Sequence, residues 1–359
     1  MKPLILFLML TLIGKSLFSQ GVKKDSLLKN TTVEGTWFLA YQYGDDGKDT
    51  ISLFTLKRGY LTVKQKFSKT FEARFTQDIT LDEEGSDAGN VEMRLKYCYL
   101  KINLPDAGFF THPFLEVGLA HRPWIDYEEK INHYRVQGSM FLDRNKVLSS
   151  ADFGVMAATF LGGKLDDEVA KNFRSSYPGK YGSIAVGVYN GGGYYAIEQN
   201  RNKIVEGRLS LRPFPSIMPG MQLSFIQTYG AGNDPASPLY MASVGALTYE
   251  CGYFTTVAQY YQGTGNFMGT FADSLGTPTD NKGFSVFFEG KIPKSRFAVI
   301  GRYDHFERYL YKDVLSRRVI AGIAYNIFNQ SKIVIDLDYL KKDGKPDNWV
   351  GEVAVEINF

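Results

Sequence analysis

Residues 349–359 read WVGEVAVEINF, so that large apolar residues alternate with polar ones up to the terminal Phe359. Successive side chains of a β-strand point to opposite faces, and this alternation therefore predicts a strand with one apolar face and one charged face. The apolar face carries Trp349, Val353, Val355, Ile357 and Phe359, and the opposite face carries Glu352, Glu356 and Asn358.

The same alternation recurs in short blocks from about residue 33 onward, with turn residues between the blocks. Counting the blocks gives about 16 strands. A soluble β-sandwich also alternates, but one of this length usually needs several domains, and 33–359 contains no linker. Strands that face lipid outside and water inside also explain the mean hydropathy of −0.20. The sequence predicts an all-β fold, a transmembrane antiparallel β-barrel over 33–359.

The connections between the blocks predict short periplasmic turns alternating with long extracellular loops. The short ones are 68–69, 251–252, 292–294 and 329–330; the longer ones are 44–51, 81–90, 191–202, 231–238, 263–282, 305–315 and 341–347. Two connections are unusual. The first, 122–150, follows an outward-running strand and is expected to fold into the barrel and narrow it. The second, 162–180, falls where a short turn is expected and contains helix-like spacing at 166–173. It is either a small periplasmic helix or a sign that the strand count is wrong by two.

The N-terminus predicts export. A basic Lys2, an apolar stretch at 4–13 and small residues at Ser19 and Gly21 are typical of a cleaved signal peptide, which we assign to 1–20, followed by a short segment at 21–32. A spanning helix would need roughly 20 apolar residues. Loss of Lys2 and Lys15 leaves 39 basic against 38 acidic residues, which argues against nucleic acid as a partner. The expected location is the outer membrane.

The two cysteines, Cys98 and Cys251, lie in a predicted strand and in a distant turn. Export would permit a disulfide between them. Because two such distant residues do not make a disulfide framework, we expect free thiols that are buried or face the pore.

The polar faces of the strands predict a charged, water-filled lumen. Basic patches favour anions in a pore, although lumen charges can also simply keep the interior wet or pair across strands. An acidic wall on the last two strands argues against strong anion selectivity. The predicted pore-lining residues are Arg58, Lys64, Lys66, Arg74, Arg94, Lys96, Arg208, Arg212, Asp336, Asp338, Glu352 and Glu356.

Within 122–150, the candidates for a constriction are Arg122, Trp124, Arg135 and Arg144. His121 and His133 raise the question of a metal site, but a loop of unknown shape separates them, and histidines at a pore mouth are the favoured interpretation. The acidic loops at 45–49 and 82–87 lack the spacing of a calcium loop. We therefore expect neither a metal nor a cofactor.

No enzyme signature is present in the sequence: it contains no Gly-x-Ser-x-Gly, no His-Glu-x-x-His and no phosphate-binding glycine loop. The glycine run 191–193 is interpreted as an external loop. An outer-membrane lipase would need a Ser–His pair, and His305 has no identifiable serine partner. We expect the protein not to be an enzyme.

Several blocks resemble the phosphate-selective porin O and P family, in the same order: RGYL at 58–61, YNG at 189–191, GRL at 207–209, GRYD at 301–304 and AGIAYN at 321–326. The resemblance implies a sixteen-stranded, commonly trimeric pore for small anions or other small solutes. The family's ladder of arginines and its lysine cluster have no matching loop here, so phosphate selectivity is not carried over. Phe359 resembles the C-terminal signal that the barrel-insertion machinery reads.

Two functions remain open at this point. The leading hypothesis is a passive outer-membrane pore for small hydrophilic solutes with a bias toward anions. The alternative is a plugged, non-conducting barrel that acts as an accessory subunit of a larger outer-membrane complex. Either would have membrane lipids as partners, with a homotrimer as one expected assembly.

Overall fold

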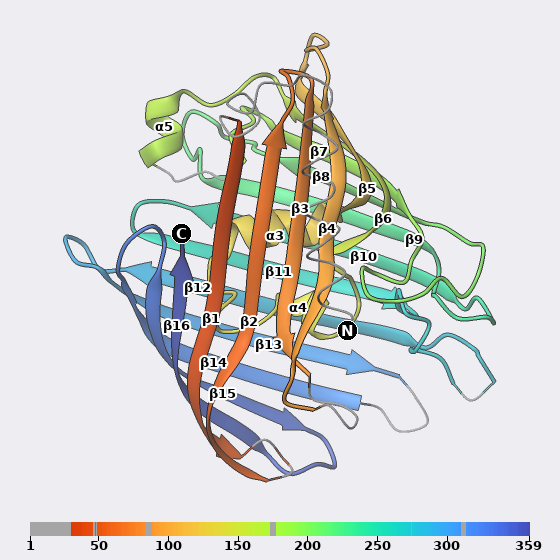
Figure 1. The fold of residues 1–359 in the computed structure, drawn as a ribbon, viewed down its shortest axis with the longest axis vertical. Coiled ribbons are helices and arrows are strands. Elements are labelled where there is room, and N and C mark those ends of the chain that lie inside the picture. Colours follow the sequence, from red (N-terminus) through yellow and green to blue (C-terminus); the bar gives the residue numbers. More distant parts are fainter. Residues whose placement is uncertain are drawn as a thin grey trace, which may run out of the picture.

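The computed structural model describes residues 30–45, 47, 49–82, 88–172, 177–273, 275–309 and 314–359. Within them, sixteen antiparallel strands form one closed barrel in which each strand pairs with its neighbours in the sequence (Figure 1). The predicted signal peptide at 1–20 lies outside the described residues. The barrel begins at Thr31 rather than at residue 33.

The strands are β1 (Thr31–Asp45), β2 (Thr50–Lys66), β3 (Phe71–Leu81), β4 (Val91–Asn103), β5 (Phe110–His121), β6 (Ala151–Leu161), β7 (Gly182–Tyr189), β8 (Ile204–Leu211), β9 (Met221–Ala231), β10 (Leu239–Glu250), β11 (Phe254–Thr264), β12 (Asp280–Lys291), β13 (Phe297–Arg308), β14 (Val314–Asn326), β15 (Lys332–Lys342) and β16 (Asn348–Asn358). The helices are α3 (Pro123–Ile131), α4 (Phe141–Arg144) and α5 (Asp167–Asn172). None of the helices in the described ranges is long and apolar enough to cross a membrane.

The last strand closes the barrel against the first, as the sequence predicts. Their register runs from Thr36 opposite Asn358 to Asp45 opposite Trp349. At the seam, the Gly35 amide donates to the Phe359 carbonyl at 2.9 Å, and the Phe359 amide donates to the Gly35 carbonyl at 3.1 Å. Closure leaves no strand with unpaired backbone groups facing lipid.

Two β-bulges in the wall change which side chains face inward. The pairing of β1 with β2 skips Lys57, and the pairing of β3 with β4 skips Lys96. Because a bulge adds one residue to a period-two pattern, the face of every following residue is exchanged. Cys98 therefore faces outward and is exposed, which corrects the expectation of a buried or pore-facing thiol; Cys251 is buried, and both are free.

The connections gather at two ends. The turn end holds 67–70, 104–109, 162–181, 212–220, 251–253, 292–296 and 327–331, and the loop end holds 46–49, 82–90, 122–150, 190–203, 232–238, 265–279, 309–313 and 343–347. Four loop-end connections are at least two residues shorter than predicted, because their flanking strands extend further: 46–49, 265–279, 309–313 and 343–347. The connection 162–181 contains the helix α5 rather than a strand pair, so the predicted strand count holds.

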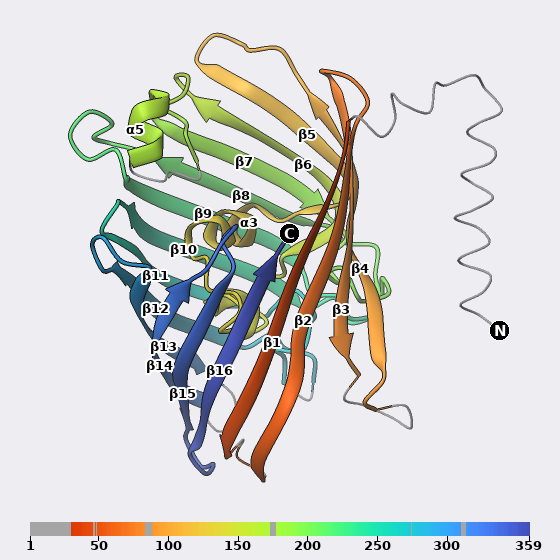
Figure 2. The ribbon, with the colours of Figure 1, turned by 60° about the vertical axis from the view of Figure 1, so that its left-hand side comes forward.

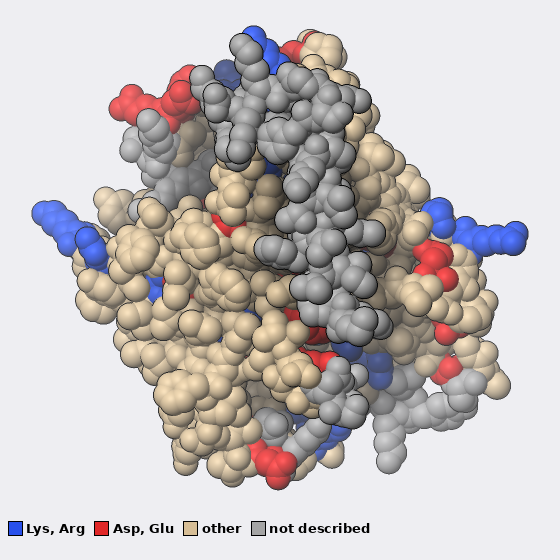
Figure 3. All heavy atoms as spheres, viewed as in Figure 1, with Lys and Arg blue, Asp and Glu red and all other residues tan. Residues whose placement is uncertain are grey.

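The outer wall is apolar. Outward side chains such as Phe153, Val186, Phe225 and Ile335 are about half exposed, and uncharged residues dominate the visible wall while charged ones gather toward its margins (Figure 3). Near the turn end, outward aromatic rings contact one another, as in the stacked pair Tyr249 and Phe254. This arrangement suits strands surrounded by lipid with aromatic residues near the interface.

The first prediction concerns Gly118 on β5, whose φ of +126° is unfavourable for any other residue, and whose added Cβ would lie 2.4 Å from the Cys98 carbonyl oxygen. We expect Gly118→Ala to destabilise the barrel by about 2 kcal/mol, measured by urea unfolding in detergent. Gly207→Ala is the matched control, because an added Cβ there has no neighbour within 4 Å. Equal stability of the two variants would contradict this assignment.

The second prediction concerns Phe359. Its deletion removes both backbone hydrogen bonds to Gly35 at the seam, and we expect it to reduce barrel assembly more than it alters conduction. The measurement is the amount of heat-resistant folded barrel in outer membranes, compared with the current per assembled channel. Normal membrane levels of the deletion variant would refute the assignment.

Candidate functional site

The connection 122–150, here called the inner segment, lies inside the barrel, with α3 and α4 between the walls (Figure 2). Its apolar side chains pack in one cluster with inward residues of β11, β12 and β13, namely Val257, Phe287 and Ile300. Trp124 and Phe141 are fully buried there. The same cluster includes Phe38 of β1, Tyr60 of β2 and Tyr240 of β10, so the inner segment packs against several sides of the lumen.

A buried ion pair fixes the start of the inner segment. Arg122 Nε donates to one Glu206 carboxylate oxygen at 2.8 Å, and Arg122 Nη2 lies 2.6 Å from the same oxygen. The other oxygen accepts the Trp124 amide at 3.0 Å, and Arg208 donates to the Pro123 carbonyl at 3.0 Å. Both charges of the Arg122–Glu206 pair are fully buried, so loss of one partner would leave the other uncompensated.

Inward side chains also satisfy backbone carbonyls of the inner segment, which has little regular structure of its own. Each donor comes from a different strand, so the segment is tied to several sides of the barrel. The bonds run from Lys57 to Gln137 (3.3 Å), from Lys332 to His133 (3.0 Å), from Arg302 to Ser139 (2.9 Å) and from Tyr240 to Val147 (2.7 Å).

Glu128 on α3 is a buried carboxyl group beside the apolar cluster. Gln259 donates to its Oε1 at 2.6 Å and accepts from the Trp124 indole at 3.2 Å. Burial raises the pKa of Glu128 to about 7, although Arg302 and the hydrogen bond from Gln259 partly oppose the shift. The helix therefore packs most stably against β11 when this carboxyl group is protonated.

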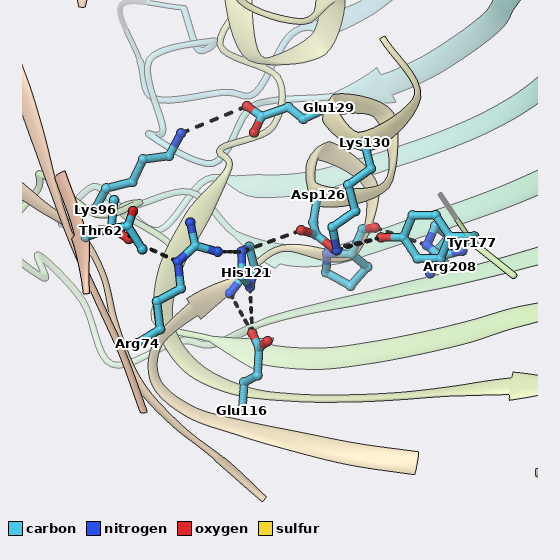
Figure 4. Close-up of polar contacts among 12 residues, drawn as sticks. Thr62, Arg74, Lys96, Glu116, His121, Asp126, Glu129, Lys130, Tyr177 and Arg208 are labelled. Atoms are coloured by element: carbon cyan, nitrogen blue, oxygen red, sulfur yellow. Dashed lines mark hydrogen bonds and ion pairs between the residues drawn. The ribbon is translucent and has the colours of Figure 1, made fainter. Parts of the chain in front are cut away.

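Two cavities, of about 550 and 370 Å³, lie at the turn-end side between α3 and the charged wall. They share four lining residues: Arg74, His121, Asp126 and Lys130. Figure 4 shows these side chains pointing toward one another from the strands and from α3. We call the two cavities together the vestibule.

His121 lines both cavities of the vestibule and contacts side chains of β3 and β5. Arg74 Nη1 lies 3.1 Å from His121 Nε2, and His121 Nδ1 lies 2.8 Å from Glu116 Oε2. His121 Nε2 also lies 3.5 Å from Asp126 Oδ1, so the imidazole contacts the Arg74 guanidinium and two carboxylates. Burial raises the pKa of Asp126, but Lys130 and His121 lower it by more, so that it lies below its usual range.

A further group of charges lies where the bulged Lys96 faces α3. The Lys96 ammonium is almost fully buried, 4.8 Å from the Tyr60 ring centre and 3.9 Å from Glu129. Arg135 of the inner segment lies 3.1 Å from the same Glu129 and donates to the Tyr60 hydroxyl at 2.5 Å. Two cations, one from the wall and one from the inner segment, therefore flank one carboxylate.

On the loop-end side, Asp78 gathers a second polar cluster. Its fully buried carboxylate accepts from Arg58 at 3.3 Å, from Arg94 at 3.2 Å and from the Tyr194 hydroxyl at 3.1 Å. Tyr194 belongs to the connection 190–203, which therefore reaches β3 along the inside of the wall. The predicted residues Arg58 and Arg94 thus face inward at one shared carboxylate.

The acidic residues of the last two strands face inward but are mostly paired. Glu352 pairs with Lys57 and accepts from Gln42. Glu356 pairs with Lys332 at 3.0 Å, and Asp338 with Arg318 at 3.1 Å. Neither oxygen of the buried Asp336 has a hydrogen-bond partner within the described ranges.

The other predicted residues lie in three kinds of place. Lys64 and Lys66 are exposed at the turn end, beside Glu34 and Glu72. Arg212 is buried and donates to the carbonyls of Tyr177 and Gly179 in the turn-end connection that carries α5. Of the constriction candidates, Arg144 contacts Gln137 at 3.3 Å, and burial together with Arg302 lowers its pKa to about 9.

The sequence prediction missed Lys57, Asp78 and Glu206, which position the inner segment and the wall cations. Lys57 was missed because its bulge has no signature in the alternation. Asp78 and Glu206 do fall on the polar faces of their blocks, and that position was the available signal. In the part of the chain that the structure describes, no group of three His, Cys, Asp or Glu side chains is arranged to hold a metal ion.

No protein-family model and no curated protein matches the sequence. Solved structures do match the fold. The anion-selective porin from Comamonas acidovorans (10% identity, TM-score 0.61) covers 92% of this chain and 99% of its own. OmpF from Salmonella typhi, in complex with daunomycin, is 9% identical with a TM-score of 0.63, and the match covers 92% of this chain and 97% of that protein. A loop-deletion mutant of OmpT from Vibrio cholerae is 10% identical with a TM-score of 0.61, and the match covers 92% of this chain and 99% of that protein. The chain has the fold of a general porin-like, sixteen-stranded barrel.

The third prediction follows from Glu128. Its pKa is higher in the folded protein than its ordinary value of 4.5, so its neutral form favours folding. The stabilisation from neutral Glu128 is fully present below about pH 4.5 and is lost as the pH rises through about 7. Its loss lowers the free energy of unfolding by roughly 3 kcal/mol at most. Urea unfolding midpoints should fall between pH 5 and pH 8, and Glu128→Gln should flatten that dependence. An unchanged pH profile in the variant would exclude Glu128 as the cause.

Proposed function

We propose that the chain forms an outer-membrane channel through which small hydrophilic solutes diffuse, with a bias toward anions. The observation that carries the proposal is the series of charged groups between the inner segment and the wall of β2–β4. It begins at Arg74 in the vestibule, passes Lys96 and Arg135, and reaches Arg58 and Arg94 at the loop end. Such groups keep a lumen hydrated and select by charge.

The bias toward anions rests on how the charges are distributed. The wall of β2–β4 contributes the cations, whereas the facing carboxylates Asp126 and Glu129 are each paired with basic residues. The acidic wall of β15 and β16 is likewise largely paired, with Lys57, Lys332 and Arg318. The resemblance to phosphate-selective porins makes phosphate one of the anions to test, but a dedicated phosphate site is not part of the proposal.

The proposal places the protein in the outer membrane, after export by the segment 1–20 and insertion by the barrel-assembly machinery. The apolar outer wall supports a lipid environment. One structure of Vibrio cholerae OmpT is described as a trimer form, and a homotrimer is therefore the first assembly to examine. No catalytic role is included: His305, considered for a lipase pair, lies 2.7 Å from Glu307.

The fourth prediction tests conduction and its selectivity in planar bilayers. The purified chain should give stepwise currents, with a reversal potential in a salt gradient that indicates anion preference. Lys96→Gln should shift this potential toward cations, because it removes a nearly buried positive charge from the wall that faces α3. Lys294→Gln, in the turn between β12 and β13, is the control and should leave the potential unchanged.

The same experiment separates the alternative function. Absence of stepwise current both from the intact chain and from a variant lacking 122–150 would contradict the channel and favour a non-conducting accessory subunit. Mild detergent extraction followed by mass spectrometry would then identify stoichiometric partners. Recovery of only a monomer or homotrimer would argue against the accessory role.

A further inference from the structure

The larger cavity of the vestibule, of about 550 Å³, has an apolar wall where a water-filled barrel is expected to be polar. Inward residues of three adjacent strands form it: Phe114 on β5, Met156 and Phe160 on β6, and Ala185 on β7. Ala158 lies between the two β6 residues. We call these five residues the apolar arc.

Packing of the inner segment does not account for the apolar arc. The inner segment contributes only Pro123, Asp126 and Lys130 to the lining of this cavity, and two of these are charged. Phe114 and Phe160 each pack against a buried cluster on one side but are only partly buried and line the cavity. An apolar surface that is left facing a hydrated cavity indicates a binding partner for it.

Beside the apolar arc, the same cavity has a basic arc formed by Lys64, Lys66, Arg74 and Lys101. Lys101 marks the junction of the two arcs, because its ammonium lies 4.4 Å from the centre of the Phe114 ring. A ligand in the cavity can therefore contact a cation and an aromatic ring at the same time.

Within the described residues, two cations of the basic arc form no salt bridge. Arg74 donates from Nε to the Thr76 hydroxyl at 3.0 Å, contacts His121 and lies over the Tyr97 ring. Among the described residues, no salt bridge involves Arg74 or Lys101.

The carboxylates of the cavity are, by contrast, already engaged. Glu72 lies 3.9 Å from Lys66, Glu116 lies 2.8 Å from His121 Nδ1, and Asp126 lies 2.7 Å from Lys130. The lining holds six lysines and arginines against these three acids, so the cavity favours a negatively charged occupant.

We propose that this cavity binds small organic monocarboxylates that carry an aromatic or branched hydrocarbon body. The carboxylate pairs with Arg74 and Lys101, since a guanidinium matches a carboxylate with two parallel donors. The hydrocarbon body packs on Phe114 and Phe160. An inorganic anion has no hydrocarbon group that could pack on the apolar arc. A neutral sugar has no negative charge that could pair with the basic arc. The inference deepens the proposed channel function by naming its preferred solute class.

The fifth prediction tests the site by calorimetry on the full chain, folded in detergent. Benzoate is the probe; acetate, benzyl alcohol and inorganic phosphate are the comparisons. Because benzoate alone uses both arcs, it should bind at least about tenfold more tightly than each of the others. This ligand series needs no variant, so its outcome does not depend on whether a substituted barrel folds.

Variants then assign the two contacts. Arg74→Gln and Phe160→Ala should each weaken benzoate binding by about tenfold, and Arg74→Lys should restore part of it. The matched controls are Lys291→Gln and Phe328→Ala, which line a separate turn-end cavity beside β12–β15 and should bind benzoate like the parent chain.

Each outcome decides between the proposals. Acetate or phosphate binding as tightly as benzoate would reduce the site to a general anion site and overturn the inference. Equal binding of benzyl alcohol would leave only an apolar pocket and overturn it as well. Benzoate binding without stepwise current would uphold the site and contradict the channel, whereas current without benzoate binding would uphold the channel and overturn the site.

Discussion

The structure depends on one constraint, that a strand in lipid must have every backbone donor and acceptor paired. The seam between β1 and β16 meets it through a continuous register that ends in the two hydrogen bonds between Gly35 and Phe359. A closed sheet of sixteen strands has no lipid-facing edge. Closure also creates an interior too wide to be filled by the wall residues alone, and the contents of that interior determine the function.

The inner segment occupies this space asymmetrically. Its apolar residues pack against β11–β13, while its backbone carbonyls accept hydrogen bonds from side chains of the wall. Many lumen charges therefore hold the segment in place rather than contact solutes. The charges that remain beside cavities lie mainly on β2–β4, with Lys96 and Arg135 on either side of Glu129. The basic arc and the apolar arc adjoin at the turn end, so the proposed contacts to a carboxylate and to a hydrocarbon body lie in one vestibule.

Period-two alternation was sufficient to predict the barrel, its strand number and the pairing of the last strand with the first. It was also sufficient to place Arg74 and Lys96 inside. It failed at Cys98, because the bulge at Lys96 exchanges the two faces and leaves no mark in the sequence pattern. Arg208 and Arg212, which it gave as pore-lining residues, are buried and donate to backbone carbonyls, and Arg208 also lines the vestibule.

Away from the two bulges, the sequence by itself determined which residues face lipid and which face inward, because that property is local and repeats with the pleat of each strand. Only the tertiary structure decided which inward charges meet. Arg122 and Glu206, or Asp78 and Tyr194, are far apart in the chain and come together through closure of the sheet and folding of the connections into it. The vestibule is likewise a product of closure, since its basic and apolar arcs lie on different strands and share one cavity only in the barrel.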